Sequence, residues 1–555
     1  MNATGIEADG APQNPAASVR EPHAQTGMSA PPCAPERELR VLRAPPHSLL
    51  TQVVLLDNTD QHNELVFENE WLLHPNEAPL ALRGNLFTVT QPAVGDGVII
   101  LKTLALPHAR PVESPADLRV SRAADFDGFD LRVVTSDPDE TAATLHVLPF
   151  SGGALGLARA LQNFQRAQRP QTPGHASPRA ISNTWGDRNR DARICEEFVA
   201  REIAAAVRLG LDAVQLDDGW QKGATSNSVN ARAQGGVWEG YWDADPDFWT
   251  PHPRRFPNGL EPLVELAASR GLALGLWFSP DSSDGFANWR RDADAILALH
   301  LRHRVCHFKL DGVKINSAAA RHNFDSLLSV LAARSAGAIV IDLDITAQIR
   351  PGYFGAIPAG VLFVENRYTD WRSYWPHHAL RNLWKLSRWL DPRRLRFEAL
   401  NPLRNAEKYP ADPLSPSSYA PDALLATVLA SNPLIWCEVS CLPEPVATAW
   451  TELLSVWRNY RDEFFAGAIL PIGDAPDGAS WTGFLSLSPD ERIAHLLIYR
   501  ELNPSPVRHF ALPFDADNFT VQLLAGAGEL SPAACGAVAT LPQKLGYLWA
   551  RLERQ

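Results

Sequence analysis

Residues 307–313 read His307-Phe308-Lys309-Leu310-Asp311-Gly312-Val313, an apolar run that ends in a lysine and an aspartate. A buried strand cannot carry two opposite charges without cost, so these charges are expected where the strand leaves the core. The same pattern occurs earlier, at Ala213-Val214-Gln215-Leu216-Asp217-Asp218-Gly219-Trp220. Two strands that both end in carboxylates predict a carboxylate-lined pocket at one end of a parallel barrel, where such barrels hold their active sites.

The bulk composition indicates a globular protein with several domains. The chain has 555 residues, 45% of them hydrophobic and 21% charged, which predicts about two to four domains. The formal net charge of −12 argues against a nucleic-acid partner or an anionic membrane, because both favour a basic face. No segment approaches the roughly 20 consecutive apolar residues of a membrane helix, so no membrane partner is expected.

The cysteines and the N-terminus both favour a cytoplasmic protein. Only Cys437 and Cys441 among the six cysteines are close in sequence, and this spacing alone is a poor zinc signal. Scattered cysteines in a long chain indicate a reducing compartment. Residues 1–40 are rich in Ala, Pro and Gly and lack the features of a signal peptide. We therefore expect a disordered tail over residues 1–40.

Hydrophobic periodicity divides the rest of the chain into four parts. Residues 41–151 show short alternating runs typical of an antiparallel β-sandwich. Residues 152–180 contain a helical segment and a Pro-rich link. In residues 181–462 apolar runs alternate with helical segments, which predicts an α/β fold of the (β/α)8 TIM-barrel type. Alternation returns in residues 463–555 and predicts a small C-terminal antiparallel β domain.

Eight segments of the predicted barrel have the length and composition of parallel strands. The fifth unit has little room for its helix because Pro351 and Pro358 interrupt it. The predicted strands are Ile181–Trp185, Ala213–Leu216, Ala273–Phe278, Cys306–Leu310, Ala338–Leu343, Val361–Val364, Leu395–Ala399 and Leu434–Glu438.

Carboxylates and tryptophans gather at the ends of these strands. Trp185, Trp220 and Trp277 lie beside the carboxylates. Carboxylates accept hydrogen bonds from sugar hydroxyls, and indole rings offer apolar faces for sugar rings. Glycosidic cleavage requires one ionised and one protonated carboxyl group. Asp311 fits the ionised role, because Lys309 emerges on the same face of the strand and its charge favours the carboxylate.

Structural roles compete with these interpretations. Lys309 and Asp311 could form a surface ion pair, Asp217-Asp218 could cap a helix or a turn, and the tryptophans could be core residues. Asp342 and Asp344 offer oxygens to magnesium or calcium, but no paired-histidine motif or calcium loop accompanies them. Motifs for a serine nucleophile or a phosphate loop are also missing from the sequence. We expect no metal and no cofactor.

Four motifs in this order resemble the α-galactosidase (melibiase) and raffinose-synthase-like clan of retaining glycoside hydrolases. They are Gln215-Leu216-Asp217-Asp218-Gly219-Trp220, Phe256-Pro257-Asn258-Gly259-Leu260, Gly275-Leu276-Trp277 and Phe308-Lys309-Leu310-Asp311. The resemblance extends roughly from Ile181 to Glu438. It implies a TIM barrel between an N-terminal β-sandwich and a small C-terminal β domain, an α-galactoside or related oligosaccharide as substrate, and, as in many relatives, a homo-oligomer.

The resemblance also implies roles for individual residues. Asp311 takes the place of the nucleophile, and Lys309 should contact sugar hydroxyls. Asp217 and Asp218 should bind the far hydroxyls of the galactosyl ring, and Trp185 should help to wall the pocket.

The proton donor departs from the family pattern. In the family an aspartate precedes a threonine after the sixth strand, whereas Tyr368 precedes Thr369 here. Asp370 follows that threonine and Glu365 lies four residues before it. We expect Asp370 to be the acid/base, with Glu365 as the alternative.

The function expected from the sequence is hydrolysis of terminal α-galactosides with retention, by double displacement. A transglycosylase, an α-hydrolase for a related sugar such as an α-N-acetylgalactosaminide, and a catalytically impaired sugar-binding relative are the alternatives.

Overall fold

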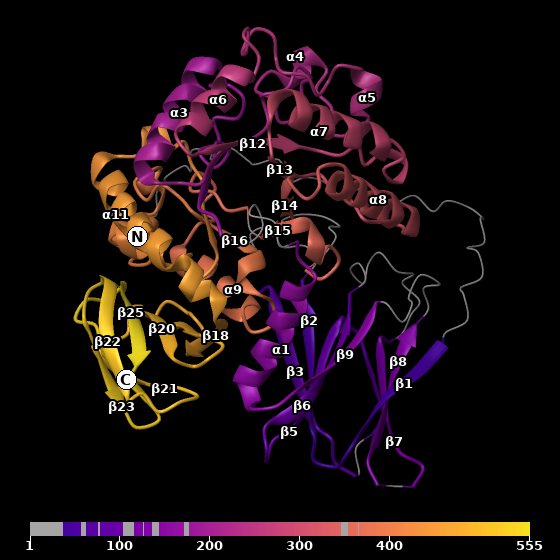
Figure 1. The fold of residues 1–555 in the computed structure, drawn as a ribbon, viewed down its shortest axis with the longest axis vertical. Helices are drawn as coiled ribbons and strands as arrows, with labels where there is room; N and C mark the ends of the chain where they lie inside the picture. Colours follow the sequence, from indigo (N-terminus) through magenta and orange to yellow (C-terminus); the bar gives the residue numbers. More distant parts are fainter. Residues whose placement is uncertain are drawn as a thin grey trace, which may run out of the picture.

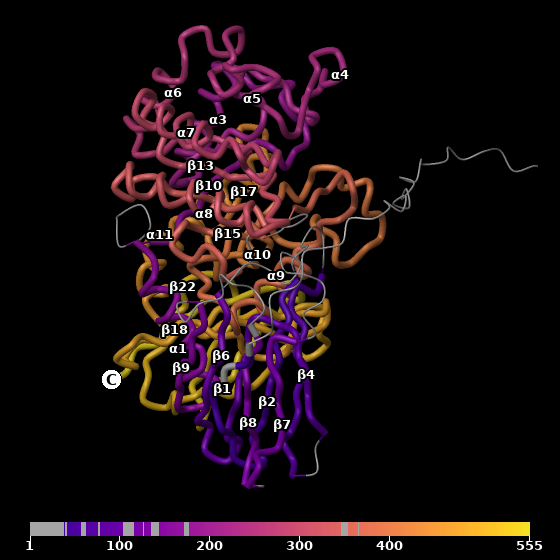
Figure 2. The backbone as a smooth tube through the Cα atoms, turned by 90° about the vertical axis from the view of Figure 1, so that its right-hand side faces the viewer, coloured from indigo at the N-terminus to yellow at the C-terminus, as the bar shows by residue number. Residues whose placement is uncertain are grey.

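The computed structural model describes residues 37–56, 63–75, 78–103, 116–125, 127–135, 144–170, 177–345, 353–364 and 366–555. A barrel occupies one end of the molecule, and two β regions lie side by side beneath it (Figure 1). The view turned by 90° shows the same division (Figure 2). The α/β architecture predicted from the sequence, a barrel with flanking β domains, is confirmed.

The barrel is a closed sheet of eight parallel strands in sequence order, β10 to β17. Three predicted strands agree to the residue, and the other five shift by one to three residues at one or both ends. The observed strands are β10 (Ile181–Asn183), β11 (Ala213–Leu216), β12 (Ala273–Phe278), β13 (His307–Leu310), β14 (Val340–Asp344), β15 (Gly360–Phe363), β16 (Leu395–Ala399) and β17 (Asn432–Ile435).

Helices surround the barrel and connect its strands. The α-helices are α3 (Glu196–Leu209), α4 (Ala231–Gln234), α5 (Tyr241–Ala244), α6 (Glu261–Ser269), α7 (Trp289–His303), α8 (Ala318–Arg334), α9 (Pro376–Leu386), α10 (Pro421–Ala426) and α11 (Glu444–Ala466). Between β14 and β15 the described residues hold only a short 3-10 helix, η3 (Ile357–Ala359). This agrees with the expectation that Pro351 and Pro358 leave little room for a helix in the fifth unit. Within the described residues, no helix combines the length and hydropathy needed to cross a bilayer.

Two antiparallel sheets precede the barrel. One has the order β1-β8-β7-β4 and the other β3-β2-β5-β6-β9, and apolar side chains from both form one core cluster. The strand β1 begins at Arg37, so residues 37–40 belong to a strand, and residues 1–36 of the expected tail lie outside the described residues. The strands are β1 (Arg37–Ala44), β2 (Leu49–Leu55), β3 (Val66–Leu72), β4 (Leu80–Leu82), β5 (Leu86–Gln91), β6 (Asp96–Lys102), β7 (Leu118–Arg122), β8 (Phe129–Thr135) and β9 (Leu145–Phe150).

The C-terminal region contains a five-stranded and a three-stranded antiparallel sheet, with the orders β18-β19-β20-β25-β22 and β21-β24-β23. The strands are β18 (Ala468–Gly473), β19 (Trp481–Leu487), β20 (Ile493–Arg500), β21 (Val507–Ala511), β22 (Phe519–Gly526), β23 (Glu529–Ala533), β24 (Gly536–Thr540) and β25 (Gly546–Arg554).

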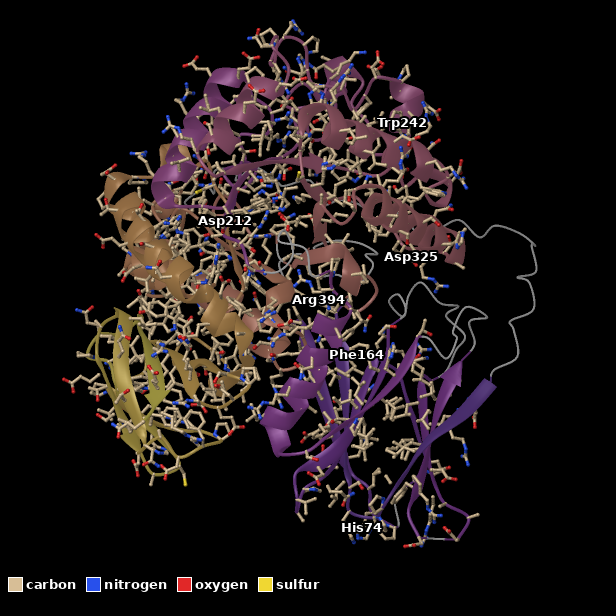
Figure 3. All side chains as sticks on the ribbon, in the orientation of Figure 1. His74, Phe164, Asp212, Trp242, Asp325 and Arg394 are labelled. Carbon is tan, nitrogen blue, oxygen red and sulfur yellow. The ribbon has the colours of Figure 1, made fainter. Side chains whose placement is uncertain are left out.

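The helix α1 (Gly153–Ala167) joins all three regions. Its Phe164 contacts His146 of β9 with ring centroids 4.6 Å apart. Gln165 accepts a hydrogen bond of 2.9 Å from Arg394 at the base of the barrel, and Ala158 belongs to the C-terminal core cluster. Figure 3 labels Phe164 and Arg394 at this junction. The helical segment predicted within residues 152–180 corresponds to α1, and this helix contacts all three regions.

Candidate active site

Lys309 is the centre of a buried charge cluster at the carboxyl ends of the barrel strands. Its Nζ lies 3.0 Å from Asp217 Oδ2, 3.4 Å from Asp344 Oδ2 and 4.0 Å from Asp311 Oδ2. Only 4% of the side chain is exposed. Burial by itself would lower the pKa of Lys309, but the charges of the three carboxylates outweigh it and raise that pKa above its ordinary value. The lysine is therefore a fixed cation beneath the strand ends.

Asp311 is the most exposed member of this cluster. It directly follows β13, and 16% of its side chain is accessible, compared with 4% for Asp217 and 2% for Asp344. Trp277 Nε1 donates a hydrogen bond of 3.1 Å to its Oδ2, and the Gly312 backbone N–H donates one of 2.6 Å to its Oδ1. These donors hold the carboxylate in one orientation and favour its ionised form.

The glycine after Asp311 is required by the turn that presents the carboxylate. Gly312 has φ +67°, in the left-handed region that residues with a β-carbon rarely adopt. A β-carbon built there would also lie 2.4 Å from Ser279 Oγ. The chain can therefore leave the strand sharply and still aim its backbone N–H at Asp311.

The two adjacent aspartates of the second strand end have different surroundings. Asp217 Oδ2 accepts hydrogen bonds from Asn183 Nδ2 at 2.8 Å and from Lys309, so it belongs to the charge cluster. Asp218 accepts from Gln221 Nε2 at 2.7 Å and from the Thr225 hydroxyl, both in the loop after β11. Burial raises the pKa of Asp218 to about 7, although these two bonds favour its ionised form.

A second layer of charge lies two residues deeper along the barrel strands. Asp342 contacts Arg396 Nε at 3.1 Å and His307 Nε2 at 2.9 Å, and accepts from Gln215 Nε2 at 3.1 Å. Burial opposes its ionisation, but the Arg396 charge prevails and lowers the pKa of Asp342 below its usual range. Asp342 and Asp344, the carboxylates considered for a metal, thus face different cations. Within the described residues no cluster of potential metal ligands is found.

The three predicted tryptophans occupy different positions. Trp277 touches Asp311, as described, but is only 1% exposed. Trp220 is fully buried, and its Nε1 donates to the Trp277 carbonyl at 2.7 Å. This hydrogen bond helps to fix the backbone at Trp277. Trp185 is half-buried, and its backbone N–H donates to Asn183 Oδ1 at 2.8 Å.

Two aromatic residues near Lys309 were not among the predicted site residues. The ring of Trp436, after β17, lies 5.1 Å from Lys309 Nζ, and that of Phe363, in β15, lies 4.9 Å away. Such contacts stabilise a desolvated ammonium. The sequence signal for Trp436 is its position directly after the eighth strand, two residues before the carboxylate Glu438.

The loop after β15 carries the predicted proton donors. Asp370 Oδ2 forms an ion pair of 3.1 Å with Arg188 Nε, and Lys408 Nζ donates to the Asp370 carbonyl at 2.9 Å. Glu365 lies outside the described residues. Tyr368, at the family's acid position, has its ring 6.2 Å from that of Trp436, which places this loop next to the charge cluster.

Asp187 and Glu438, the carboxylates of the first and eighth strand ends, have structural partners. Arg404 Nε lies 3.2 Å from Asp187, and the Glu438 backbone N–H donates to Asp187 at 3.1 Å. Burial raises the pKa of Asp187 to about 6. Glu438 is bound by Arg193 and by Asn189 Nδ2 at 2.7 Å. Both residues link loops rather than join the Lys309 cluster.

Comparisons with known proteins agree with the resemblance found in the sequence. No protein-family model matches the chain. A stretch of 129 residues is 32% identical to Alpha-galactosidase 2 of Pediococcus pentosaceus and covers 23% of this chain and 15% of the relative. Another of 141 residues is 26% identical to the Alpha-galactosidase of Escherichia coli and covers 25% of this chain and 17% of the relative. The matches thus span less than a fifth of these curated relatives.

Solved structures are similar over much more of the chain. The GH36 α-galactosidase AgaA from Geobacillus stearothermophilus superimposes with a TM-score of 0.64 at 12% identity, covering 93% of this chain and 76% of that one. The α-galactosidase from Lactobacillus brevis gives 0.63 at 12% identity, covering 94% and 75%. At this identity the likeness establishes the fold. Structures of AgaA variants contain raffinose and stachyose.

Proposed function

We propose that this chain is a retaining α-glycosidase that hydrolyses terminal α-galactosides, with Asp311 as the nucleophile. The observation that carries the proposal is the position of Asp311, the most exposed carboxylate around a buried Lys309. The lysine charge and the two hydrogen bonds to Asp311 favour an ionised carboxylate, which the attack on the anomeric carbon requires. The similarity to α-galactosidases supports the choice of sugar.

The neighbours of Asp311 suit a neutral polyhydroxylated ring. Lys309 can donate hydrogen bonds to sugar hydroxyls, and Asp217 can accept them. Asp218 supports the same ring from the loop after β11, where Gln221 and Thr225 orient it. We therefore propose that the galactosyl hydroxyls replace part of the hydrogen bonding that now links these groups.

The proposed reaction has two displacements. Asp311 Oδ attacks the anomeric carbon and forms a glycosyl ester, while the acid gives its proton to the leaving oxygen. The same residue then takes a proton from water, and that water cleaves the ester with net retention. We propose Asp370 as this residue and Glu365 as the alternative. Asp370 is paired with Arg188, and it must leave this ion pair to protonate the leaving oxygen. In a retaining enzyme the two carboxyl groups, here those of Asp311 and Asp370, lie about 5–5.5 Å apart.

A screen of aryl α-glycosides, raffinose and stachyose tests the proposal. The wild type should release galactose, and NMR should detect the α-anomer of the product before the β-anomer. Asp311→Asn should lower kcat on an aryl α-galactoside at least about 10³-fold, as expected for loss of a nucleophile. Asp294→Asn is the matched control, because Asp294 is an exposed residue of α7 paired with Arg334. Equal activity of the two variants would reject Asp311 as nucleophile.

The same screen with an α-N-acetylgalactosaminide, and analysis of transfer products, separates the enzymatic alternatives.

A sugar-binding relative without catalysis is the second candidate, favoured by the Asp370–Arg188 ion pair and by Tyr368 at the family's acid position. Asp370→Gly separates the two. If Asp370 is the acid/base, azide should restore turnover of an activated aryl α-galactoside by this variant and yield the glycosyl azide. Galactose binding without turnover of any α-galactoside by the wild type would instead establish the binding protein.

We propose a cytoplasmic location on separate grounds. The five cysteines in the described part of the chain are all free, as expected in a reducing compartment. Fractionation of the native cell, followed by detection of the protein, tests this location. Recovery outside the cytoplasm would reject it.

A further inference from the structure

A groove on the outer side of the barrel takes no part in the proposed reaction. It lies between the loop after β11, the first residue of α6 and the C-terminal half of α7. Its volume is about 640 Å³, within the range of about 300–1,000 Å³ that small-molecule sites occupy. Figure 3 labels Trp242, which lines this groove beside α5 and α7.

Strand β12 separates the groove from the Lys309 cluster. In the floor of the groove, Trp249 stacks on Phe278, with ring centroids 4.0 Å apart and an interplanar angle of 26°. Phe278 is the last residue of β12, and the preceding residue, Trp277, donates its hydrogen bond to Asp311. Because successive residues of a strand face opposite sides, Trp249 covers the outer side of β12. The groove is therefore distinct from the candidate active site.

The indole N–H of Trp249 is the observation that points to a ligand. Only 4% of Trp249 is exposed, and within the described part of the chain its Nε1 has no hydrogen-bond partner. The indole packs among the rings of Tyr241, Phe248 and Trp277, whose centroids lie 5.3, 5.0 and 5.7 Å away, and the groove is its open side. A buried N–H without an acceptor is uncommon in native proteins, so a ligand in the groove would supply what the chain does not.

The loop wall of the groove holds a fixed shape. Proline fixes its own φ angle, and the His252 backbone N–H ties this wall to the barrel by donating to the Trp220 carbonyl at 2.9 Å. A groove formed in advance loses little conformational entropy when a ligand binds. Four prolines line it: Pro246, Pro251, Pro253 and Pro257.

The charged groups of the groove favour a neutral ligand. Asp247 and Glu261 contribute carboxylates to its lining, and Arg302 and His303 contribute a guanidinium and an imidazole. Lys222 Nζ lies 3.3 Å from Asp247 Oδ2, and His303 Nδ1 lies 2.9 Å from Glu261 Oε1. An anion would face two carboxylates and a cation would face Arg302, whereas a hydroxyl group can donate to the first and accept from the second.

We propose that this groove is a second carbohydrate site, separate from the candidate active site, which binds a neutral mono- or disaccharide. Its apolar floor includes the buried side chains of Phe256 and Leu299 and packs against the C–H face of a sugar ring, which removes both surfaces from water. A sugar oxygen accepts the hydrogen bond from Trp249 Nε1. The site goes beyond the proposed function and does not depend on turnover.

NMR of the indole N–H groups tests the site directly. The full chain is labelled with ¹⁵N at the tryptophan indoles and titrated with galactose, maltose and sucrose in turn. Trp249→Phe keeps an aromatic ring but removes the N–H, so the resonance missing from this variant is that of Trp249. In the wild type this resonance should move to lower field and saturate, because the N–H gains an acceptor. A Trp249 resonance that none of the three sugars moves would overturn the proposal.

Filling the groove from its rim gives a second, independent test. Ala298 is an exposed residue of α7 that lines the groove, so Ala298→Trp should occupy the space without disturbing the core. Calorimetry should show at least about tenfold weaker binding of the sugar that moves the Trp249 resonance, because the new indole excludes it. Ala268→Trp is the matched control, since Ala268 is an exposed alanine of α6 outside the groove, and it should bind the sugar like the wild type.

The outcomes are independent of the proposed reaction. Wild-type affinity in Ala298→Trp would place the sugar elsewhere on the protein and overturn the second site. Hydrolysis of an aryl α-galactoside is measured in parallel and should be equal in Ala298→Trp and the wild type. Absence of hydrolysis in both, together with loss of sugar binding in Ala298→Trp alone, rejects the enzymatic proposal and supports the second site.

Discussion

At the residue scale, the chemistry depends on one lysine that is nearly inaccessible to water. A buried cation is tolerated only when carboxylates and aromatic faces replace its hydration. Lys309 has three carboxylates within 4.0 Å and two aromatic rings within 5.1 Å. The carboxylates depend equally on the lysine, because Asp217 and Asp344 are themselves buried.

Replacing Lys309 should therefore destabilise the protein strongly. Lys309→Met keeps the length of the side chain but leaves two buried carboxylates without their cation, which should lower the free energy of unfolding by about 3–5 kcal/mol. Lys314→Met, which breaks the exposed pair with Glu239, should cost about 0–1 kcal/mol. Urea unfolding followed by near-UV circular dichroism compares the two. A similar loss in both variants would contradict the role of Lys309 as the cation of the cluster.

At the element scale, α3 fixes the loop that follows the last barrel strand. Its Glu202 is fully buried and accepts hydrogen bonds from the backbone N–H groups of Val439 at 2.8 Å and Ser440 at 3.0 Å. These residues begin the short helix η7 (Val439–Cys441), directly after Glu438. Burial raises the pKa of Glu202 to about 7 even though the hydrogen bonds favour its ionised form. The native protein therefore retains a proton that the unfolded chain releases.

This proton predicts a pH dependence of stability. Because the native pKa of Glu202 is raised to about 7 from 4.5, its contribution is fully present below pH 4.5 and is lost as the pH rises to about 7, with a total of about 3 kcal/mol. Glu202→Gln should remove this dependence, so its unfolding free energy should fall less over that range. Glu197→Gln, at an 85% exposed side chain of the same helix, should behave like the wild type. Parallel pH profiles for all three proteins, measured by urea unfolding, would refute the assignment.

At the scale of the whole molecule, the N-terminal sheets are attached to the barrel through α9. Glu64, just before β3, is bound by Arg381 and Lys385, and Glu68 pairs with Arg388 at 2.7 Å. The contact continues to the loop of the proposed acid, since Arg367 Nη1 donates to Asn63 Oδ1 at 3.0 Å. The N-terminal region is thus connected to the candidate site.

Loss of this attachment should be measurable as reduced stability. Glu64→Gln keeps the size of the side chain but removes its charge, and should lower the free energy of unfolding by about 1–2 kcal/mol. Glu70→Gln, at an exposed position of β3, is the control and should have no effect. Limited proteolysis reports the same change as faster cleavage between the sheets and the barrel. Identical stability and cleavage of the two variants would show that the Glu64 contacts do not hold the regions together.

The sequence by itself determined the barrel and the strand ends that carry the candidate carboxylates. Strands such as Ala213–Leu216 and Leu395–Ala399 were located to the residue, because an apolar run between polar turns is a local signal. Asp217 and Asp311 were placed at strand ends for the same reason. The periodicity of the strand also indicated that Lys309 and Asp311 share a face.

Only the tertiary structure decided which of these groups meet. Asp217 joins Lys309 while its neighbour Asp218 turns toward Gln221, and local sequence does not specify that choice. Trp436 approaches Lys309, and Arg188 connects Asp370 with Trp371, although these residues are far apart in the chain. The physical reason is that closure of the barrel brings distant strand ends together, and their final contacts depend on burial and charge compensation among all of them.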